Sequence, residues 1–161
     1  ETARMVKKNI RFNVIGNRGD LPPDVIALLD KAIIDTAACS GMVLALALSY
    51  GGRQEISMAA TRIARDVAAG ELSPDDISVN TFGKYLDTGG LPDPDFLIRT
   101  SGEMRISNFL LWQLAYTELY FTETNWPDFT INEFHKALLD YQSRERRFGM
   151  TSEQLTPVNG H

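Results

Sequence analysis

The sequence predicts an α/β fold in which a mostly parallel β-sheet is flanked by helices. Short apolar segments alternate with amphipathic ones in the order β-α-β-α-α-β-α-β-α, which favours parallel strands joined by right-handed crossovers. Residues 42–50 are apolar throughout, as expected for a strand buried on both faces of a parallel sheet. With 161 residues, 43% of them apolar, the chain is expected to form one domain over residues 1–149, followed by a flexible tail at 150–161.

The first three elements are predicted from local composition. Residues 9–17 are rich in β-branched and aromatic side chains and end on turn residues, which is typical of a strand. Residues 20–41 open with Pro22 and Pro23 and then carry apolar residues at helical spacing, which predicts a helix packed on the sheet. Residues 42–50 follow as the buried strand.

The same criteria predict the remaining elements. Ser73 and Ser107 are suited to capping helix N-termini, because a serine hydroxyl can accept a backbone N–H of the first turn. The predicted helices cover residues 54–72, 73–86, 107–116 and 131–149, and the predicted strands cover residues 94–100 and 118–122.

Charge and cysteine content exclude several classes of protein. The net charge is −5 and the pI about 5.0, so nothing draws the whole molecule to nucleic acid, and an anionic ligand would need a local group of arginines. The single cysteine, Cys39, excludes an intramolecular disulfide and is expected to be a small buried residue in a reducing cytoplasm. No apolar run reaches the ~20 residues of a membrane-spanning helix, and no leader is seen at the N-terminus. We therefore expect a cytoplasmic protein.

Arg99, Arg105 and Ser107 form the main candidate site. Arg99 follows the apolar strand segment at its carboxyl end, where ligands collect in parallel sheets. If a helix begins at Ser107, its N-terminus would favour an anion at the same place. Two guanidinium groups suit the several charges of a diphosphate. The alternative is structural: the arginines pair with Glu103 or other neighbours, and Ser107 only caps the helix.

Glu118 and the C-terminal arginines are weaker candidates. Glu118 lies between an apolar helix and an apolar strand, so its carboxylate needs a metal, an arginine or water. Mg²⁺ is possible, since it commonly uses one or two carboxylates with substrate phosphates, and an ion pair or simple exposure is the alternative. Arg144, Arg146 and Arg147 would complement the negative end of the last predicted helix.

Several long motifs resemble one known family. The strings "PDFLIRTSGEMRISNFLLWQLAYTELYFT", "WPDF", "RERRFG" and "YGGRQEI" are similar to those of the cis-prenyltransferases, specifically the bacterial undecaprenyl diphosphate synthases, over about residues 9–149. The resemblance implies a homodimeric enzyme with a parallel sheet flanked by helices. It also implies a Mg²⁺-dependent condensation of isopentenyl diphosphate with farnesyl diphosphate to give cis double bonds. The product would be the membrane lipid that carries cell-wall sugars, which implies a place in the cytoplasm, at most peripheral to the inner membrane face.

The resemblance also implies roles for individual residues. Arg99, Arg105 and Ser107, with the backbone of Ile106, would hold the diphosphate of isopentenyl diphosphate, and Glu118 would be linked to the metal. The Arg-x-Gly element of Arg147 and Gly149 would reach toward the isopentenyl site of the partner subunit.

Departures from the family pattern limit what this chain is expected to do. The motif His-x-x-x-Met-Asp-Gly-Asn-Gly-Arg-Trp, whose aspartate binds Mg²⁺ in the family, does not occur, and Met104 cannot replace a ligating histidine. The resemblance implies that the chain corresponds to roughly the C-terminal two-thirds of a family member, and we expect it to contain no catalytic residue of its own. We expect it to bind isopentenyl diphosphate without turnover. A noncatalytic partner subunit and an unrelated phosphate-binding module are the alternatives, and product length cannot be inferred.

Overall fold

The computed structural model describes residues 1–145, which form parts of two compact units, Glu1–Leu91 and Pro92–His161. Both units combine parallel strands with helices, so the predicted α/β class is confirmed. The strands form two separate two-stranded sheets in the described part of the chain, where the sequence had suggested one sheet. A single domain over residues 1–149 stays a prediction, and the predicted tail at 150–161 lies outside the described residues.

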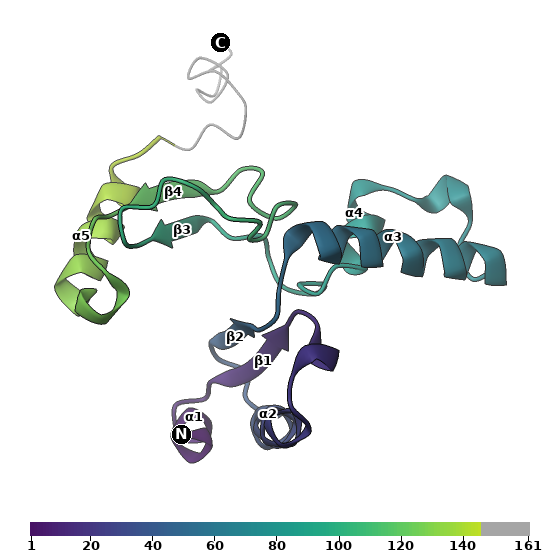
Figure 1. The fold of residues 1–161 in the computed structure, drawn as a ribbon, viewed down its shortest axis with the longest axis horizontal. Coiled ribbons are helices and arrows are strands. Elements are labelled where there is room, and N and C mark those ends of the chain that lie inside the picture. Colours follow the sequence, from purple (N-terminus) through teal and green to yellow (C-terminus); the bar gives the residue numbers. More distant parts are fainter. Residues whose placement is uncertain (146–161) are drawn as a thin grey trace, which may run out of the picture. The chain divides into compact units, whose positions relative to one another are not determined.

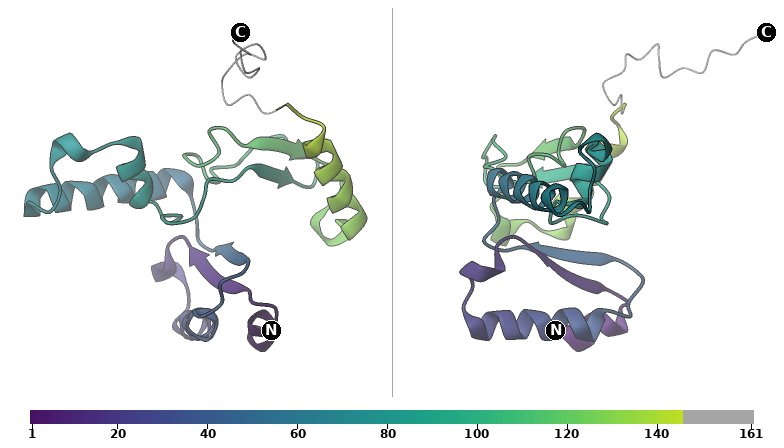
Figure 2. Two further views of the ribbon diagram at one scale, coloured as in Figure 1. Left: turned by 180° about the vertical axis from the view of Figure 1, so that it is seen from behind. Right: turned by 90° about the vertical axis from the view of Figure 1, so that its right-hand side faces the viewer.

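The first unit contains a parallel strand pair supported by helices (Figure 1). Strands β1 and β2 are in register from Arg11 opposite Val43 to Ile15 opposite Ala47. Helices α1 and α2 lie along one side of this pair, as the right-hand view of Figure 2 also shows. The elements are α1 Thr2–Lys7, β1 Arg11–Ile15, the 3-10 turn Arg18–Asp20, α2 Pro23–Thr36, β2 Val43–Ala47, α3 Gly52–Ala69, the 3-10 turn Pro74–Asp76 and α4 Val79–Lys84.

Thr36 connects the end of α2 to β1 by a hydrogen bond. Its side chain is fully buried, and its hydroxyl accepts the backbone N–H of Phe12 at 3.0 Å while donating to the carbonyl of Ala32 at 2.8 Å. The hydroxyl thus satisfies an outward N–H of β1 that the strand pair does not use. Cys39 follows shortly after and is buried, as predicted.

The prediction that residues 42–50 are buried on both faces is wrong for this structure. All five residues of β2 are exposed, with Leu44 at 38% and Leu46 at 40%. The reason is that β2 pairs only with β1 among the described residues, so its second edge carries no strand. A continuous apolar pattern is typical of a strand with neighbours on both edges, which β2 does not have among the described residues.

The second unit contains the other parallel pair and one long helix. Strand β3, Phe96–Arg99, pairs with β4, Glu118–Phe121, and the 3-10 turn Trp126–Asp128 precedes α5, Ile131–Gln142. The ring of Tyr141 on α5 lies 4.8 Å from the ring of Phe96, measured between centroids, and this contact seats the helix on the strands.

Three predicted helices are shorter than expected or absent. Residues 107–116 form turns, because Ser107, Asn108 and Leu110 have φ values of 47°, 64° and 46°, which no right-handed helix allows. In the 73–86 segment the helix covers only α4, with the hydroxyl of Ser78 accepting the N–H of Thr81. Helix α5 ends at Gln142, before the predicted end at residue 149.

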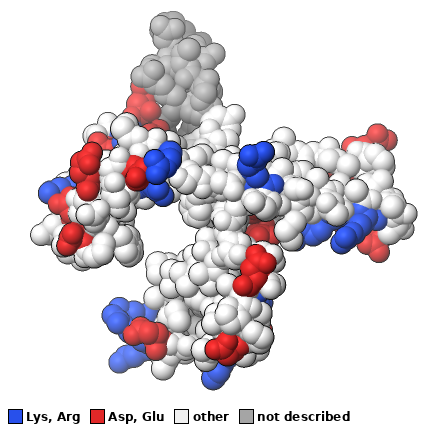
Figure 3. All heavy atoms as spheres, in the orientation of Figure 1, with Lys and Arg blue, Asp and Glu red and all other residues white. Residues whose placement is uncertain are grey.

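Charged side chains are mixed over the surface. On the face drawn in Figure 3, basic and acidic residues are interspersed on the described part of the chain, and no large region of one sign is seen. None of the helices in the described residues has the length and apolar content needed to cross a bilayer.

Candidate functional site

Arg99 is the last residue of β3, and its guanidinium has a buried Nε without an acceptor among the described residues. Its backbone carbonyl accepts the N–H of Thr122 at 2.9 Å, which continues the strand ladder. The Nε atom of Arg99 is buried and has no hydrogen-bond acceptor, and no ion pair involves Arg99 among the residues described. A buried charged donor without a partner is costly, so this position is suited to an anion that would complete its hydrogen bonds.

The loop after β3 is fixed to the segment that follows β4. The N–H groups of Ser101 and Gly102 donate to the carbonyls of Thr124 and Thr122, both at 2.9 Å. Gly102 has a φ of 68°, and a Cβ at this position would overlap the carboxylate of Glu123. The start of the loop that carries Arg105 is therefore held by backbone hydrogen bonds.

Arg105 and Ser107 lie farther along this loop. Arg105 forms an ion pair with Glu103, and its side chain is 66% exposed, so water screens the interaction and it contributes little stability. This pair is the structural alternative that the sequence left open for Arg105, although an exposed guanidinium can still exchange one anion for another. Ser107 is exposed and caps no helix, so the expected contribution of a helix N-terminus to the site is absent. The carbonyl of half-buried Ile106 accepts the N–H of Phe109 at 2.9 Å.

Glu118 lies at the other end of the strand pair from Arg99. It stands opposite Phe96 at the start of β4, whereas Arg99 stands opposite Phe121 at the carboxyl end. Its carboxylate accepts a hydrogen bond from Arg144 Nη1 at 2.9 Å, with both side chains less than one third exposed. Of the partners considered from the sequence, the structure shows the arginine.

Arg144 joins this pair to the end of α5. Its guanidinium also donates to Asp140 Oδ2 at 2.5 Å and to the carbonyl of Leu119 at 2.9 Å. Burial lowers the pKa of Arg144, but the hydrogen bonds and charges of Glu118 and Asp140 together raise it above its ordinary value. Arg144 therefore binds the start of β4, and the predicted role at the helix dipole is replaced by specific ion pairs.

The described residues do not form a magnesium site by themselves. They contain no group of three or more histidine, cysteine, aspartate or glutamate side chains close enough to share an ion. Arg147 and Gly149, the expected Arg-x-Gly element, lie outside the residues that the structure describes.

A buried carboxylate cluster that the sequence analysis missed lies in the first unit. Glu55 is 3% exposed and accepts hydrogen bonds from the hydroxyl of Tyr50 at 2.6 Å and from the N–H of Asp87 at 2.9 Å. Asp87 in turn accepts the N–H of Gly16 at 3.1 Å and pairs with Arg62 at 3.4 Å. The available signal was an acidic residue on the apolar face of the predicted helix 54–72.

Comparisons with known proteins agree with this fold. The prenyltransferase family model described as "Putative undecaprenyl diphosphate synthase" matches residues 1–149. An isoprenyl transferase of Geobacter sulfurreducens is 66% identical over 96% of this chain and 63% of its own. The ditrans,polycis-undecaprenyl-diphosphate synthase ((2E,6E)-farnesyl-diphosphate specific) of Pseudomonas syringae pv. tomato is 49% identical over 96% of this chain and 62% of its own.

A solved structure supports the same relationship. The lavandulyl diphosphate synthase of Lavandula x intermedia, crystallised with dimethylallyl diphosphate, superposes with a TM-score of 0.88 at 42% identity, over 92% of this chain and 64% of that one. The fold and these matches define an α/β protein of the prenyltransferase class. The chain belongs to the undecaprenyl diphosphate synthase family. It spans less than two thirds of the length of these relatives.

Proposed function

We propose that this chain supplies the isopentenyl diphosphate site of an undecaprenyl-type diphosphate synthase. The enzyme would condense isopentenyl diphosphate with farnesyl diphosphate in cis geometry and so make the membrane lipid that carries cell-wall sugars. The observation that supports this function is the guanidinium of Arg99, whose buried Nε has no acceptor among the described residues. A diphosphate would supply oxygens to it and would compete with Glu103 for the exposed Arg105.

Each group in the proposed site has a separate task. Arg99 would orient one phosphate from a partly buried position, whereas Arg105 would close over the other after leaving Glu103. Ser107 is exposed and could donate its hydroxyl, and the backbone beside Ile106 would line the site. Such fixed donors hold the incoming unit for attack on the allylic substrate. Arg147 and Gly149 would extend to the isopentenyl site of a second subunit in a homodimer.

Mg²⁺ is part of the proposal through the family, with Glu118 as its assigned residue in this chain. Bound Mg²⁺ would neutralise diphosphate charge. Because the carboxylate of Glu118 pairs with Arg144, the ion would have to compete with that guanidinium for it. The proposed location remains the cytoplasm, at most peripheral to the inner membrane face.

Binding of isopentenyl diphosphate to the chain tests the site directly. Calorimetry should show binding that Arg99→Gln and Arg105→Ala each weaken by about tenfold or more, since charged hydrogen bonds typically contribute ~1.5–3 kcal/mol. Arg65→Gln, an exposed arginine on α3, is the matched control and should bind normally. Arg105→Ala should weaken the binding of farnesyl diphosphate much less than that of isopentenyl diphosphate. Equal losses for both substrates would show that the loop is misassigned.

Turnover distinguishes the proposed enzyme from a noncatalytic partner subunit. Radiolabelled isopentenyl diphosphate, farnesyl diphosphate and Mg²⁺ would be incubated with the chain alone. They would also be incubated with the chain extended by the preceding segment of the Geobacter sulfurreducens relative. Product only from the extended chain supports the proposal. No product from either form, combined with activation of a second family member, would support the partner subunit instead.

A further inference from the structure

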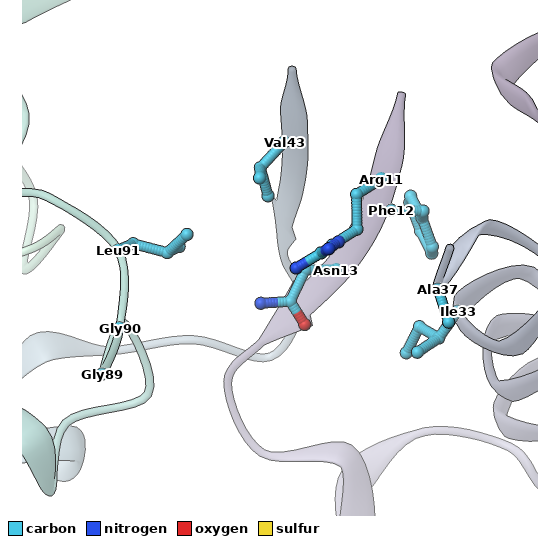
Figure 4. A pocket seen from close by; sticks show the side chains of 9 residues that line it. All are labelled: Arg11, Phe12, Asn13, Ile33, Ala37, Val43, Gly89, Gly90 and Leu91. Atoms are coloured by element: carbon cyan, nitrogen blue, oxygen red, sulfur yellow. The ribbon is translucent and has the colours of Figure 1, made fainter. Parts of the chain in front are cut away.

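The first unit contains a cavity of about 420 Å³ that the proposed function does not use. It borders the first half of β1, the second half of α2, the start of β2 and the Gly89–Leu91 segment (Figure 4). Its volume falls in the range of about 300–1,000 Å³ that is typical of small-molecule sites. Its described lining residues all belong to the Glu1–Leu91 unit, whereas the loop with Arg105 belongs to the other unit.

The polar side chains that line the cavity, Arg11 and Asn13, both offer hydrogen-bond donors to it. Arg11 Nε donates to the carbonyl of Cys39 at 2.9 Å, which orients the guanidinium and leaves its two Nη groups without an acceptor in the described part of the chain. The Asn13 carbonyl oxygen accepts the N–H of Val14 at 2.9 Å, so only the amide NH₂ is left to contact a ligand. Figure 4 shows the two groups lying side by side between β1 and Leu91. No carboxylate is among the lining residues in the part of the chain that the structure describes.

The rest of the lining is apolar or backbone. The apolar side chains are those of Phe12, Ile33, Ala37, Val43 and Leu91. Gly89 and Gly90 add backbone without side chains, and Gly90 has a φ of 89°. The cavity therefore combines one oriented cation and an amide donor with walls that can receive a short hydrocarbon.

We propose that this cavity binds a small amphiphilic anion, a phosphate or carboxylate head on a short apolar chain. The head would accept from the Arg11 Nη groups and from the Asn13 amide, and the chain would lie against Leu91 and Val43. Because Arg11 is exposed, the charge contribution is screened by water and by salt. The site should therefore bind with modest affinity that falls as ionic strength rises.

Backbone amide shifts in NMR spectra of the full chain test the proposal with butyl phosphate, butyrate, butanol and inorganic phosphate. We expect saturable shifts around Asn13 and Gly90 with the two amphiphilic anions, and much weaker effects with butanol or phosphate. The tighter of the two anions identifies the preferred head group. Arg11→Gln should weaken its binding about tenfold or more, since charged hydrogen bonds are lost. Arg65→Gln is the matched control with unchanged binding.

Two further variants keep the test decisive if Arg11→Gln disturbs the fold. Leu91→Ala should weaken butyl phosphate while leaving the weak binding of inorganic phosphate unchanged, because only the apolar wall is removed. Asn13→Leu should weaken the binding of both anions and leave the binding of butanol unchanged. Shifts confined to the Arg99–Ser107 loop, or equal binding of butanol and butyl phosphate, would overturn the proposal. So would unchanged affinity in a folded Arg11→Gln protein.

Discussion

The backbone N–H of Asp87 donates a hydrogen bond of 2.9 Å to the buried carboxylate of Glu55. The other oxygen of Glu55 accepts from the hydroxyl of Tyr50, just after β2, and Asp87 itself accepts the N–H of Gly16, just after β1. Two carboxylates thus hold three chain segments at the carboxyl ends of β1 and β2. This arrangement makes Glu55 a structural centre of the first unit.

Glu55→Ala should lower the free energy of unfolding by about 1–3 kcal/mol or more, because it leaves the Asp87 N–H and the Tyr50 hydroxyl without their acceptor. Tyr50→Phe removes only one of these bonds and should cost about 0.5–1.5 kcal/mol. Urea unfolding followed by circular dichroism measures both, and exposed Glu71→Ala is the control. If Glu55→Ala were no more destabilising than the control, the carboxylate would not hold these segments.

Gly16 and Gly70 offer a matched test of backbone geometry. Both have positive φ values, 107° and 76°, but a Cβ on Gly16 would overlap the carbonyl oxygen of Leu48, whereas one on Gly70 would meet nothing within 4 Å. Gly70→Ala should cost about 1–2 kcal/mol from conformation alone. Gly16→Ala should cost about 1–3 kcal/mol more, since backbone must move. Equal unfolding free energies for the two variants would contradict the close approach of Gly16 to Leu48.

Tyr85 should make the stability of the first unit depend on alkaline pH. A hydrogen bond to the carboxylate of Asp66, followed by burial and the charges of Asp66 and Glu71, raises the pKa of Tyr85 above its ordinary value. The folded state thus favours the protonated phenol. Its stabilising contribution is complete below the unfolded pKa and is lost as pH rises through the folded pKa.

Difference absorbance between the wild type and Tyr85→Phe during an alkaline titration measures this effect. The tyrosinate signal that the substitution removes should appear at a higher pH than in the urea-unfolded chain. Asp66→Asn should move it back toward the ordinary value. A difference signal at the same pH in folded and unfolded chains would rule out the Asp66 contact as a proton-holding interaction.

The sequence predicted the parts of the fold that depend on local pattern. The Pro22–Pro23 start of α2, the strands and the apolar face of α3 all follow from short-range periodicity. The turns at 107–116 could not be predicted in this way. The apolar run there suits a helix, and the left-handed backbone of Ser107 and Asn108 has no signature such as glycine.

The candidate site was predictable in its residues more than in its geometry. The position of Arg99 follows from the strand that ends there, because strand ends are where parallel sheets bind ligands. The separation of Glu118 from Arg99 depends on strand register, which the sequence does not encode locally. The buried Glu55 was missed because one of its hydrogen-bond partners, Asp87, comes from a distant part of the sequence.

The ion pair between Glu118 and Arg144 bears directly on the proposal that Glu118 binds Mg²⁺. In a double-mutant cycle, Glu118→Gln and Arg144→Gln should couple by about 0.5–1 kcal/mol, since both groups are partly buried and their geometry is shared with Asp140. The exposed pair of Lys31 and Asp35 on α2 should couple by only about 0.3–0.5 kcal/mol and serves as the control.

Measurements with and without Mg²⁺ then show whether Glu118 pairs with Arg144 or binds the ion. If the carboxylate is committed to Arg144, unfolding free energies and the coupling should be the same with Mg²⁺ and with a chelator. If Glu118 holds the ion, Mg²⁺ should stabilise the wild type and Arg144→Gln by mass action, and Glu118→Gln should abolish that gain. We expect the first result in the absence of diphosphate, because one carboxylate already bonded to a guanidinium is a poor magnesium site.

Repeating the cycle with isopentenyl diphosphate present tests whether Mg²⁺ bound to the substrate oxygens draws Glu118 away from Arg144. A coupling that falls only when both Mg²⁺ and the diphosphate are present would show that exchange, and an unchanged coupling would leave Glu118 a structural residue.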